Sequence, residues 1–301
     1  MAQEHSTAQQ PQLQHQLVGV VGRDTFPAGH LVITADDLGF TRGDGVFDAT
    51  RVATSAQGKS TVDHLDRHFD RFDRSIAGIG GTSIDRDAWR ASISQALERW
   101  TLPGEAVLKI MWSHGQETQQ PSSPTQVFTI TQLSETLAQE RDHGVDVVTL
   151  CRGTSSTMHR DAPWLLGGVK TLSYAGNIAA KREAKRRGAQ DVLFTTTDGY
   201  CLEAPTSALI VLIEGIMLTT PVEGTGILAS ITQSTIFEAA EAEGFTTRTA
   251  LLTPEQVITS EGAWFVSSVR GAVPIKSLDG HQLPRHDKLT AQLRRWAGFT
   301  G

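Results

Sequence analysis

The sequence predicts an α+β protein of two domains. With 301 residues, the chain is about twice as long as an average domain of ~150 residues. Strand-like and helix-like segments follow one another irregularly, which favours α+β over a doubly wound parallel sheet. The polar stretch 134–145 is expected to be a linker or surface helix between a small α+β domain, 17–133, and a large one, 146–301.

The small domain is expected to contain two helices and four strands. Residues 1–16 are polar and include six glutamines, which predicts a disordered tail before it. Val62, Leu65 and Phe69 recur at steps of three and four residues, as on one face of a helix. The predicted helices are 61–76 and 89–100, and the predicted strands are 17–21, 46–52, 106–112 and 126–131.

The large domain is expected to mix both element types. Gly188 follows a basic, alanine-rich segment and predicts the end of a helix. Asp198-Gly199 predicts the turn of a hairpin. The predicted helices are 174–188 and 232–243, and the predicted strands are 145–150, 192–196, 200–203, 209–213, 216–219, 264–268 and 273–277.

Composition excludes several classes of protein. The 27 Lys and Arg against 33 Asp and Glu give a net charge of −6, so we expect no nucleic acid partner. Two cysteines, Cys151 and Cys201, cannot form a disulfide framework or a thiolate zinc site, which fits a reducing compartment. The sequence has no run of the ~20 apolar residues that cross a bilayer, and no apolar signal segment. We therefore expect a cytoplasmic protein without a membrane partner.

One pair of histidines has a spacing found in metal sites. His64 and His68 stand four residues apart on a predicted helix, where two imidazoles can face one ion. No third ligand has a motif of its own, so two residues at the edge of an amphipathic helix are the better explanation of the pair. We predict no metal site.

Lys170 is the first candidate for chemistry. Gly167, Gly168 and Val169 precede it at a strand-to-helix junction, where an amine is less solvated than on an open surface. Desolvation lowers the pKa of an amine and frees its lone pair for a Schiff base with a carbonyl. The alternative is a solvated lysine without a role.

Two further stretches offer an acid and an anion site. Glu203 lies between apolar segments, and a buried carboxylate needs a partner, either a bound cation or a structural arginine. Glycines in 224–233 lead into a predicted helix, whose N–H groups, with the hydroxyls of Ser230 and Thr232, can bind a phosphate. Alternatively, Ser230 is only the N-cap of this helix, and no phosphate binds there. Arg67 is either a cation for the same phosphate or a solvated side chain.

The order of these stretches resembles the fold-type IV pyridoxal-phosphate enzymes: branched-chain aminotransferases, D-amino acid aminotransferases and 4-amino-4-deoxychorismate lyases. The resemblance covers about residues 17–283 and depends on five motifs in register. These motifs are Gly43-Asp44-Gly45-Val46-Phe47, His64-Leu65-Asp66-Arg67, Lys170-Thr171-Leu172-Ser173-Tyr174, Asp198-Gly199-Tyr200 through Glu203, and Ile227-Leu228-Ala229-Ser230-Ile231-Thr232. The resemblance implies a D-amino acid aminotransferase-like α+β fold, pyridoxal 5'-phosphate as cofactor, and a homodimer with its active site near the subunit interface.

The resemblance also implies roles for the residues around the cofactor ring. Lys170 would carry the cofactor as a Schiff base, the internal aldimine, and then move the substrate's α-proton. Glu203 would hold the pyridine nitrogen protonated, so that the ring accepts electrons. Leu228 would pack against a ring face, and Tyr174 would lie near the phenolic oxygen.

The phosphate site implied by the resemblance combines three residues. Arg67, the backbone of Ile231 and Thr232, and the hydroxyl of Thr232 would hold the phosphate group. Ser230 stands where glycine is usual in the family.

The substrate residues depart most from the family pattern. Ser207-Ala208 stands where Ser-Asn is frequent, and His114 where an arginine is common. Arg270 is a candidate to replace that arginine in holding a substrate carboxylate. Some lyases place a catalytic threonine three residues before Gly-Asp-Gly, where this chain has Phe40 with Thr41 adjacent.

These motifs leave two reactions open and favour the lyase. In that reaction, 4-amino-4-deoxychorismate releases pyruvate and becomes 4-aminobenzoate through the Lys170 aldimine. The alternative is a class IV aminotransferase acting on branched-chain or D-amino acids. A second alternative, a non-catalytic ligand-binding relative, is opposed by the presence of both Lys170 and Glu203.

Overall fold

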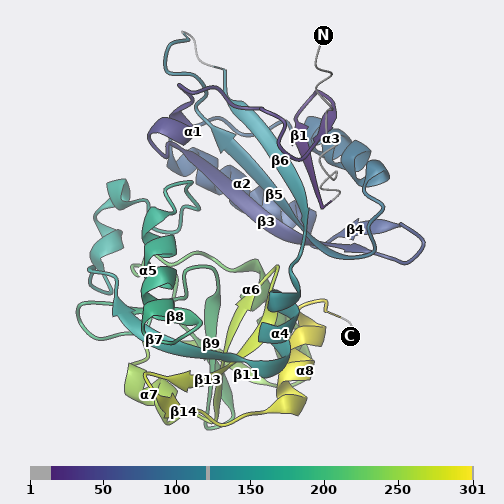
Figure 1. Ribbon diagram of the computed structural model, residues 1–301. Coiled ribbons are helices and arrows are strands. Elements are labelled where there is room, and N and C mark those ends of the chain that lie inside the picture. The colour runs from purple at the N-terminus through teal and green to yellow at the C-terminus, as the bar shows by residue number, and fades with distance from the viewer. Residues whose placement is uncertain (1–14, 120–122, 300–301) are drawn as a thin grey trace, which may run out of the picture.

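The computed structural model describes residues 15–119 and 123–299, and these form two sheets, one above the other in Figure 1. The upper sheet has six antiparallel strands in the order β2-β1-β6-β5-β3-β4. They are β1 (Gln16–Val20), β2 (Thr25–Pro27), β3 (Gly45–Thr54), β4 (Ser60–Val62), β5 (Gly104–Ser113) and β6 (Thr125–Gln132). All of them come from the region predicted to be the small domain.

Two helices with apolar faces, α2 (Leu65–Gly78) and α3 (Arg86–Arg99), pack on this sheet. Phe69 and Phe72 of α2 meet Trp89 of α3 edge-on, with ring centres 6.5 and 5.7 Å apart. Helix α2 begins later than predicted because residues 60–62 form strand β4 and His64 adopts a left-handed conformation with φ 47°. The short helix α1 (Leu38–Thr41) precedes β3.

The lower sheet has eight strands and is mixed. Its main path is β11-β10-β9-β12-β13-β7-β8, and β14 pairs with β13. The pairs β13–β7, β7–β8 and β10–β11 are parallel, and the others are antiparallel. The strands are β7 (Val145–Cys151), β8 (Asp191–Thr195), β9 (Ala208–Ile213), β10 (Ile216–Thr219), β11 (Thr246–Thr249), β12 (Gly262–Ser267), β13 (Gly271–Leu278) and β14 (His281–Gln282).

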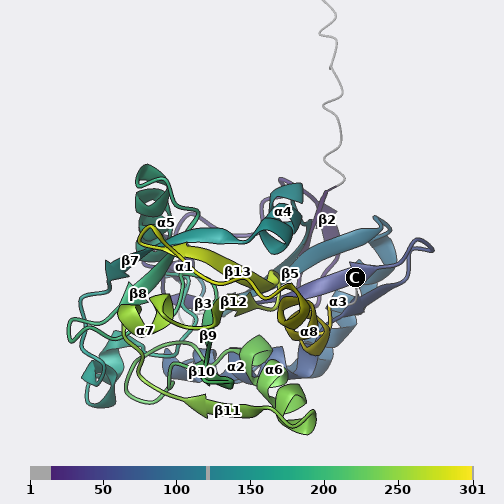
Figure 2. The same cartoon turned by 90° about the horizontal axis from the view of Figure 1, so that it is seen from below.

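Helices surround this sheet and bury both of its faces. Helix α5 lies beside β8, while α6 and α8 pack together toward the other end of the sheet (Figures 1 and 2). Buried residues of β9 and β12 point alternately into two apolar clusters. The helices are α4 (Glu135–His143), α5 (Ala175–Arg186), α6 (Ile231–Ala242), α7 (Pro254–Ile258) and α8 (Asp287–Trp296), with 3-10 turns at Met158–Arg160 and Pro163–Leu165.

The stretch 134–145, expected to be a linker or surface helix, contains helix α4, whose Arg141 donates to the carbonyl oxygens of Val269 and Arg270 and so fixes the helix to the large sheet. Two expectations need correction. Residues 200–203 are not a regular strand. The Thr196 N–H donates to Tyr200 and the Leu202 N–H donates to Phe194, as a hairpin requires, but the Phe194 N–H donates to Glu203 instead of Leu202, which leaves Thr195–Cys201 as an isolated bridge. Residues 1–14 of the predicted tail 1–16 lie outside the described residues. The predicted end of the tail is too late, because Gln16 is already the first residue of β1.

The C-terminal segment connects the two halves. Arg51 of β3 donates to the carbonyl oxygen of Gly298 at 2.6 Å and stacks over the Phe299 ring, 3.8 Å from its centre. Arg141 of α4 stacks on the same ring at 4.7 Å. The two sheets are therefore held in a defined orientation, with a cavity between them.

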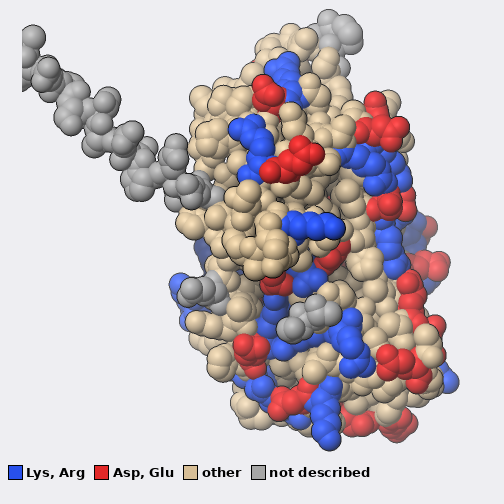
Figure 3. Space-filling model, turned by 90° about the vertical axis from the view of Figure 1, so that its right-hand side faces the viewer, with Lys and Arg blue, Asp and Glu red and all other residues tan. Residues whose placement is uncertain are grey.

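The surface carries interspersed charges. On the face shown in Figure 3, Lys and Arg side chains alternate with Asp and Glu side chains. Among the described residues, no helix is both long and apolar enough to cross a membrane.

Candidate active site

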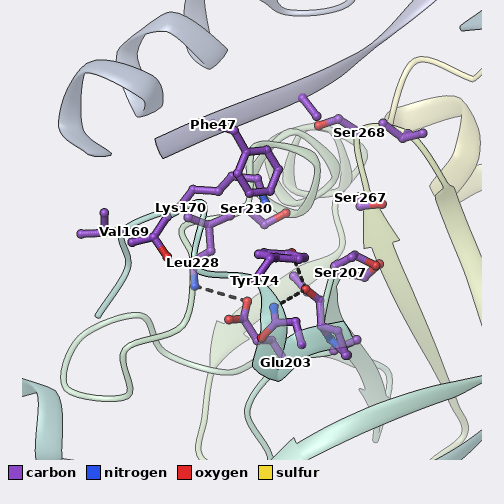
Figure 4. Close-up of a pocket in the computed structure, with 18 of the residues that line it drawn as sticks. Phe47, Val169, Lys170, Tyr174, Glu203, Ser207, Leu228, Ser230, Ser267 and Ser268 are labelled. Atoms are coloured by element: carbon purple, nitrogen blue, oxygen red, sulfur yellow. Dashed lines mark hydrogen bonds between the residues drawn. The ribbon is translucent and has the colours of Figure 1, made fainter. Parts of the chain in front are cut away.

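A cavity of about 630 Å³ lies between the two sheets. Phe47 and Lys109 line it from strands of the upper sheet, and Arg71 lines it from α2. Most of the remaining wall comes from four segments of the lower half: 166–174, 203–208, 226–230 and 266–270. Figure 4 shows how these side chains converge.

Lys170 is fixed in the wall by its own backbone. Its N–H donates to the Ser75 hydroxyl at 3.2 Å, and its carbonyl oxygen accepts from the Phe47 N–H at 2.9 Å. The ammonium nitrogen lies 4.5 Å from the centre of the Phe47 ring. Burial, with a further contribution from the positive charge of Arg71, lowers the pKa of Lys170 to about 8. A substantial fraction of this amine is therefore neutral near pH 7 to 8, as a nucleophile requires.

Glu203 faces the same cavity. One carboxylate oxygen accepts from the Leu228 N–H at 3.3 Å, drawn as a dashed line in Figure 4, and the other lies 3.4 Å from Arg152. Burial raises the pKa of Glu203, while the positive charge of Arg152 acts in the opposite direction. This carboxyl group is thus placed to hold a hydrogen-bond donor that enters the cavity.

Tyr174 and Leu228 complete the apolar wall around these groups. The Tyr174 hydroxyl donates to the Pro205 carbonyl oxygen at 2.5 Å, and its ring meets Phe47 edge-on at 5.2 Å. Burial raises the pKa of Tyr174, so the phenol stays protonated. Leu228 lines the cavity directly. All four residues expected around a cofactor ring therefore lie on one cavity.

The structure does not bring Arg67 to this cavity. Its guanidinium pairs with Glu238 at 2.7 Å on the exposed side of α6, and 37% of the side chain is accessible to solvent. Arg71, one turn later, is the arginine that lines the cavity, and its Nη1 donates to the Ala229 carbonyl oxygen at 3.1 Å. The sequence repeats His-x-x-Arg at this point, as His64-Leu65-Asp66-Arg67 and then His68-Phe69-Asp70-Arg71. In the structure, His68, Phe69 and Arg71 of the second copy are buried, whereas the first copy lies nearer the surface.

The start of α6 lies at the same end of the cavity as Arg71. Ser230 caps the helix by accepting from the Gln233 N–H at 3.2 Å, and it also lines the cavity. Thr232 is buried, with its hydroxyl 3.0 Å from that of Ser268, which lines the cavity. The side chains of Ile231 and Thr232 stand behind this wall. A guanidinium, hydroxyls and a helix N-terminus thus surround one end of the cavity.

Of the four candidate substrate residues, three lie outside this cavity. Phe40 is 69% exposed on α1, and the Thr41 hydroxyl donates to the Asp37 carbonyl oxygen at 3.0 Å. His114 Nε2 lies 3.0 Å from the Ile79 carbonyl oxygen, and its ring meets Trp112 edge-on.

Arg270 does line the cavity, and it is buried. Its guanidinium lies 2.5 Å from Asp191 and 3.1 Å from Glu140. Two carboxylates therefore balance its charge, and the departure of His114 from the family pattern is not offset by a free arginine at this position.

Several cavity residues were not singled out from the sequence. Arg152 and Lys109 are cations on the wall, and Ser267 adds a hydroxyl. Asp48, buried behind Arg71, was recognisable as the one charged residue within Val46-Phe47-Asp48-Ala49. Among residues 15–119 and 123–299, no group of three or more His, Cys, Asp or Glu is arranged to hold a metal ion.

Comparisons with known proteins define the class. Residues 45–278 match the family model for class IV aminotransferases. The bifunctional aminodeoxychorismate lyase / D-amino acid transaminase of Mycobacterium tuberculosis is 34% identical over 89% of this chain and 93% of its own length. The chain belongs to the class IV aminotransferase family, a family of pyridoxal-phosphate enzymes.

Solved structures agree with this assignment. A hypothetical aminotransferase from Mycobacterium tuberculosis in its PLP-bound form gives a TM-score of 0.87 at 33% identity, over 94% of this chain and 98% of that one. A fold IV transaminase from Curtobacterium pusillum gives 0.85 at 34% identity, over 95% and 99%. The fold is therefore that of a fold-type IV enzyme, as the sequence predicted.

The cavity fits pyridoxal 5'-phosphate in size and in chemistry. It places a partly neutral amine, a carboxyl group and an anion-binding end in one space of about 630 Å³. The amine suits the aldehyde, the carboxyl group suits the pyridine nitrogen, and the anion-binding end suits the phosphate.

Proposed function

We propose that this protein is a pyridoxal-phosphate-dependent 4-amino-4-deoxychorismate lyase, which releases pyruvate and 4-aminobenzoate. The placement of Lys170 and Glu203 on one cavity, with an amine pKa of about 8, supports pyridoxal-phosphate chemistry of either kind, and the choice of the lyase depends on the sequence motifs and on one relative. The name of the 34% identical relative includes this lyase activity.

Lys170 supplies the basic group in this proposal. Its Nζ would hold the cofactor through the aldehyde, and as a free amine the same nitrogen would take the proton from the substrate's α-carbon. The rings of Phe47 and Tyr174, 4.5 and 5.7 Å from this nitrogen, limit its contact with water and keep its pKa low. When bound, the cofactor supplies an electron sink for the carbon that loses the proton.

Glu203 and Arg71 hold the two ends of the cofactor. Glu203 accepts a hydrogen bond from the pyridinium, and Arg152 beside it helps to keep the carboxyl group ionised. Arg71 replaces Arg67 as the proposed phosphate ligand, together with Ser268 and the start of α6. Leu228 packs on the ring.

A transaminase acting on D-amino acids is the second candidate. It is favoured by the other activity in the name of the same relative, and by a similar structure from Mycobacterium tuberculosis with α-ketoglutarate and PMP bound. Both reactions use the same lysine and carboxylate, so the cavity supports either one. Lys170 and Glu203 together oppose a non-catalytic ligand-binding role.

Two parallel assays test the proposal. Purified protein loaded with pyridoxal phosphate is given 4-amino-4-deoxychorismate, and pyruvate is measured with lactate dehydrogenase. In the second assay, D-alanine, D-glutamate or branched-chain amino acids are given with a 2-oxo acid. We expect pyruvate from the first substrate at a higher kcat/KM than any amino transfer. Amino transfer without pyruvate release would replace the lyase by the transaminase.

We also propose that the protein is a homodimer. Three large apolar side chains, Leu31, Phe40 and Trp164, are 90%, 69% and 75% exposed in the single chain, which a subunit interface would explain. Light scattering coupled to gel filtration tests this, with Phe40→Ser expected to weaken the dimer. A monomer at micromolar concentration would contradict it.

A further inference from the structure

Behind the anion-binding end of the cavity, a chain of buried hydrogen bonds leads away from the cavity wall. His68 Nδ1 lies 2.8 Å from Asp48 Oδ1, and His68 Nε2 lies 3.3 Å from the Ser268 hydroxyl. The Ser268 hydroxyl lies 3.0 Å from that of Thr232. His68 and Asp48 are almost completely buried, and Ser268 lines the cavity. The chain therefore connects a titratable ring to a hydroxyl at the phosphate end.

The direction of each hydrogen bond follows from the charge on Asp48. Burial alone would raise the pKa of Asp48, but the guanidinium of Arg71 and the ring of His68 lower it, so the carboxylate is ionised and only accepts. His68 Nδ1 must then carry a hydrogen. In neutral His68, Nε2 has a lone pair and accepts from the Ser268 hydroxyl, which in turn can accept from Thr232. Both hydroxyl hydrogens are then used within the chain, and neither is available to a group in the cavity.

A phosphate group needs donors, and protonation of His68 would provide one. With a proton from solvent on Nε2, the imidazolium donates to Ser268, and the Ser268 hydrogen is free to turn toward an anion in the cavity. The other charged groups near His68 are Asp48 on β3 and Arg71 and His64 on α2. Asp48 lies against the ring and favours the proton, while Arg71 and His64 oppose it.

We propose that His68 is a positioning residue for the cofactor phosphate, which reverses the Ser268 hydrogen bond by taking up a proton when the phosphate binds. This rests on the proposed function, because it assigns the anion as the phosphate of pyridoxal phosphate. Burial lowers the pKa of His68 in the free protein, so the ring is neutral before the anion arrives. Binding then raises that pKa, and the affinity for the phosphate falls as pH increases through the value of the complex.

The contribution of the phosphate group to binding is isolated by comparing two ligands. Cofactor-free protein is titrated with pyridoxal phosphate and with pyridoxal, which lacks the phosphate, from pH 5.5 to 8.5. The ratio of the two dissociation constants reports the phosphate contribution, because the reaction of Lys170 is common to both. The matched variant is His68→Gln, whose amide can hydrogen-bond but does not titrate. Ionisation of the phosphate itself affects both proteins equally.

In the wild type, relative to His68→Gln, we expect the phosphate preference to fall with increasing pH, by up to about tenfold per pH unit for one coupled proton. Ser268→Ala keeps the histidine but removes the hydroxyl that it contacts, so this variant should lose the same pH dependence. It tests the proposal independently if His68→Gln does not fold. Equal pH profiles in wild type and variants, with the phosphate preference retained, would overturn the proposal. Absence of any phosphate preference at all pH values would instead overturn the proposed function.

Discussion

Arg71 and Asp48 form a bidentate ion pair beside the cavity: Nε lies 2.8 Å from Oδ2, and Nη2 lies 2.7 Å from Oδ1. Both side chains are buried, with 7% of the arginine and none of the aspartate accessible. The pair fixes the guanidinium plane at the phosphate end of the cavity. Arg67, one turn earlier, makes its ion pair with exposed Glu238 instead.

The first prediction compares these two arginines. Arg71→Ala should weaken binding of pyridoxal phosphate by about tenfold or more, since a hydrogen bond to a charged group contributes ~1.5–3 kcal/mol. It should also lower the free energy of unfolding by about 3–5 kcal/mol, because the buried Asp48 carboxylate loses its arginine and keeps only its hydrogen bonds with His68 and the Ala49 N–H. Arg67→Ala is the control and should change stability by no more than about 1 kcal/mol. Equilibrium binding measures the affinity, and urea unfolding measures the stability. A loss of phosphate selectivity in Arg67→Ala would make Arg67, not Arg71, the phosphate ligand.

The second prediction concerns the covalent attachment site. Lys170→Ala should abolish the visible absorption band of the loaded protein and its bleaching by borohydride, because the amine that holds the aldehyde is gone. Lys109→Ala, which removes another lysine of the same cavity, should keep the band. Mass spectrometry of the borohydride-treated protein should place the label on Lys170. A label on Lys109 would be incompatible with the proposed mechanism.

The third prediction concerns the carboxyl group. Glu203→Gln should retain the cofactor while lowering kcat by a factor on the order of 10² or more, because an amide does not hold the pyridine nitrogen protonated. Retention is expected since the phosphate end and Lys170 are unchanged. Cofactor content is read from absorbance and kcat from pyruvate release. A kcat equal to that of the wild type would remove Glu203 from the mechanism.

The fourth prediction is a pH dependence of the amine. The rate at which pyridoxal reacts with cofactor-free protein should rise with pH and level off near pH 8, because only the neutral amine is a nucleophile and burial holds the pKa of Lys170 at about 8. Below that pH, the rate should fall about tenfold per pH unit as the amine is protonated. Nα-acetyllysine in solution is the control and should level off near the ordinary lysine pKa of 10.5. A protein profile that follows the control would show that Lys170 is solvated.

The fifth prediction concerns the contact between the two halves. Phe299→Ala should lower the free energy of unfolding by about 3–5 kcal/mol, the usual cost of removing a buried phenyl ring. The ring is 8% exposed, with Arg51 and Arg141 stacked against it. Val222→Ala, at a side chain that is 45% exposed, is the control and should have little effect. Similar urea midpoints for the two variants would mean that this contact does not stabilise the fold.

The strands and most helices could be predicted because local patterns determine them. Alternation of apolar and polar residues predicts β5 and β6, and apolar residues spaced three and four positions apart predict α3. Helix α8 was overlooked although Leu289, Leu293 and Trp296 have helical spacing. The second arm of the hairpin is not a regular strand because the Leu202 carbonyl oxygen accepts from the Thr220 hydroxyl and not from β8, a contact that no local pattern contains.

By itself, the sequence determined the fold class, the family motifs and the identity of the lysine and glutamate of the site. Only the tertiary structure decided which of two His-x-x-Arg copies reaches the cavity, because the two lie one helical turn apart and meet different partners: Arg67 bonds to Thr235 within α6, and Arg71 bonds to Ala229 just before it. It also decided that Arg270 is neutralised by Asp191 and Glu140. Charges in a buried site are set by partners from distant segments, and only folding brings those partners together.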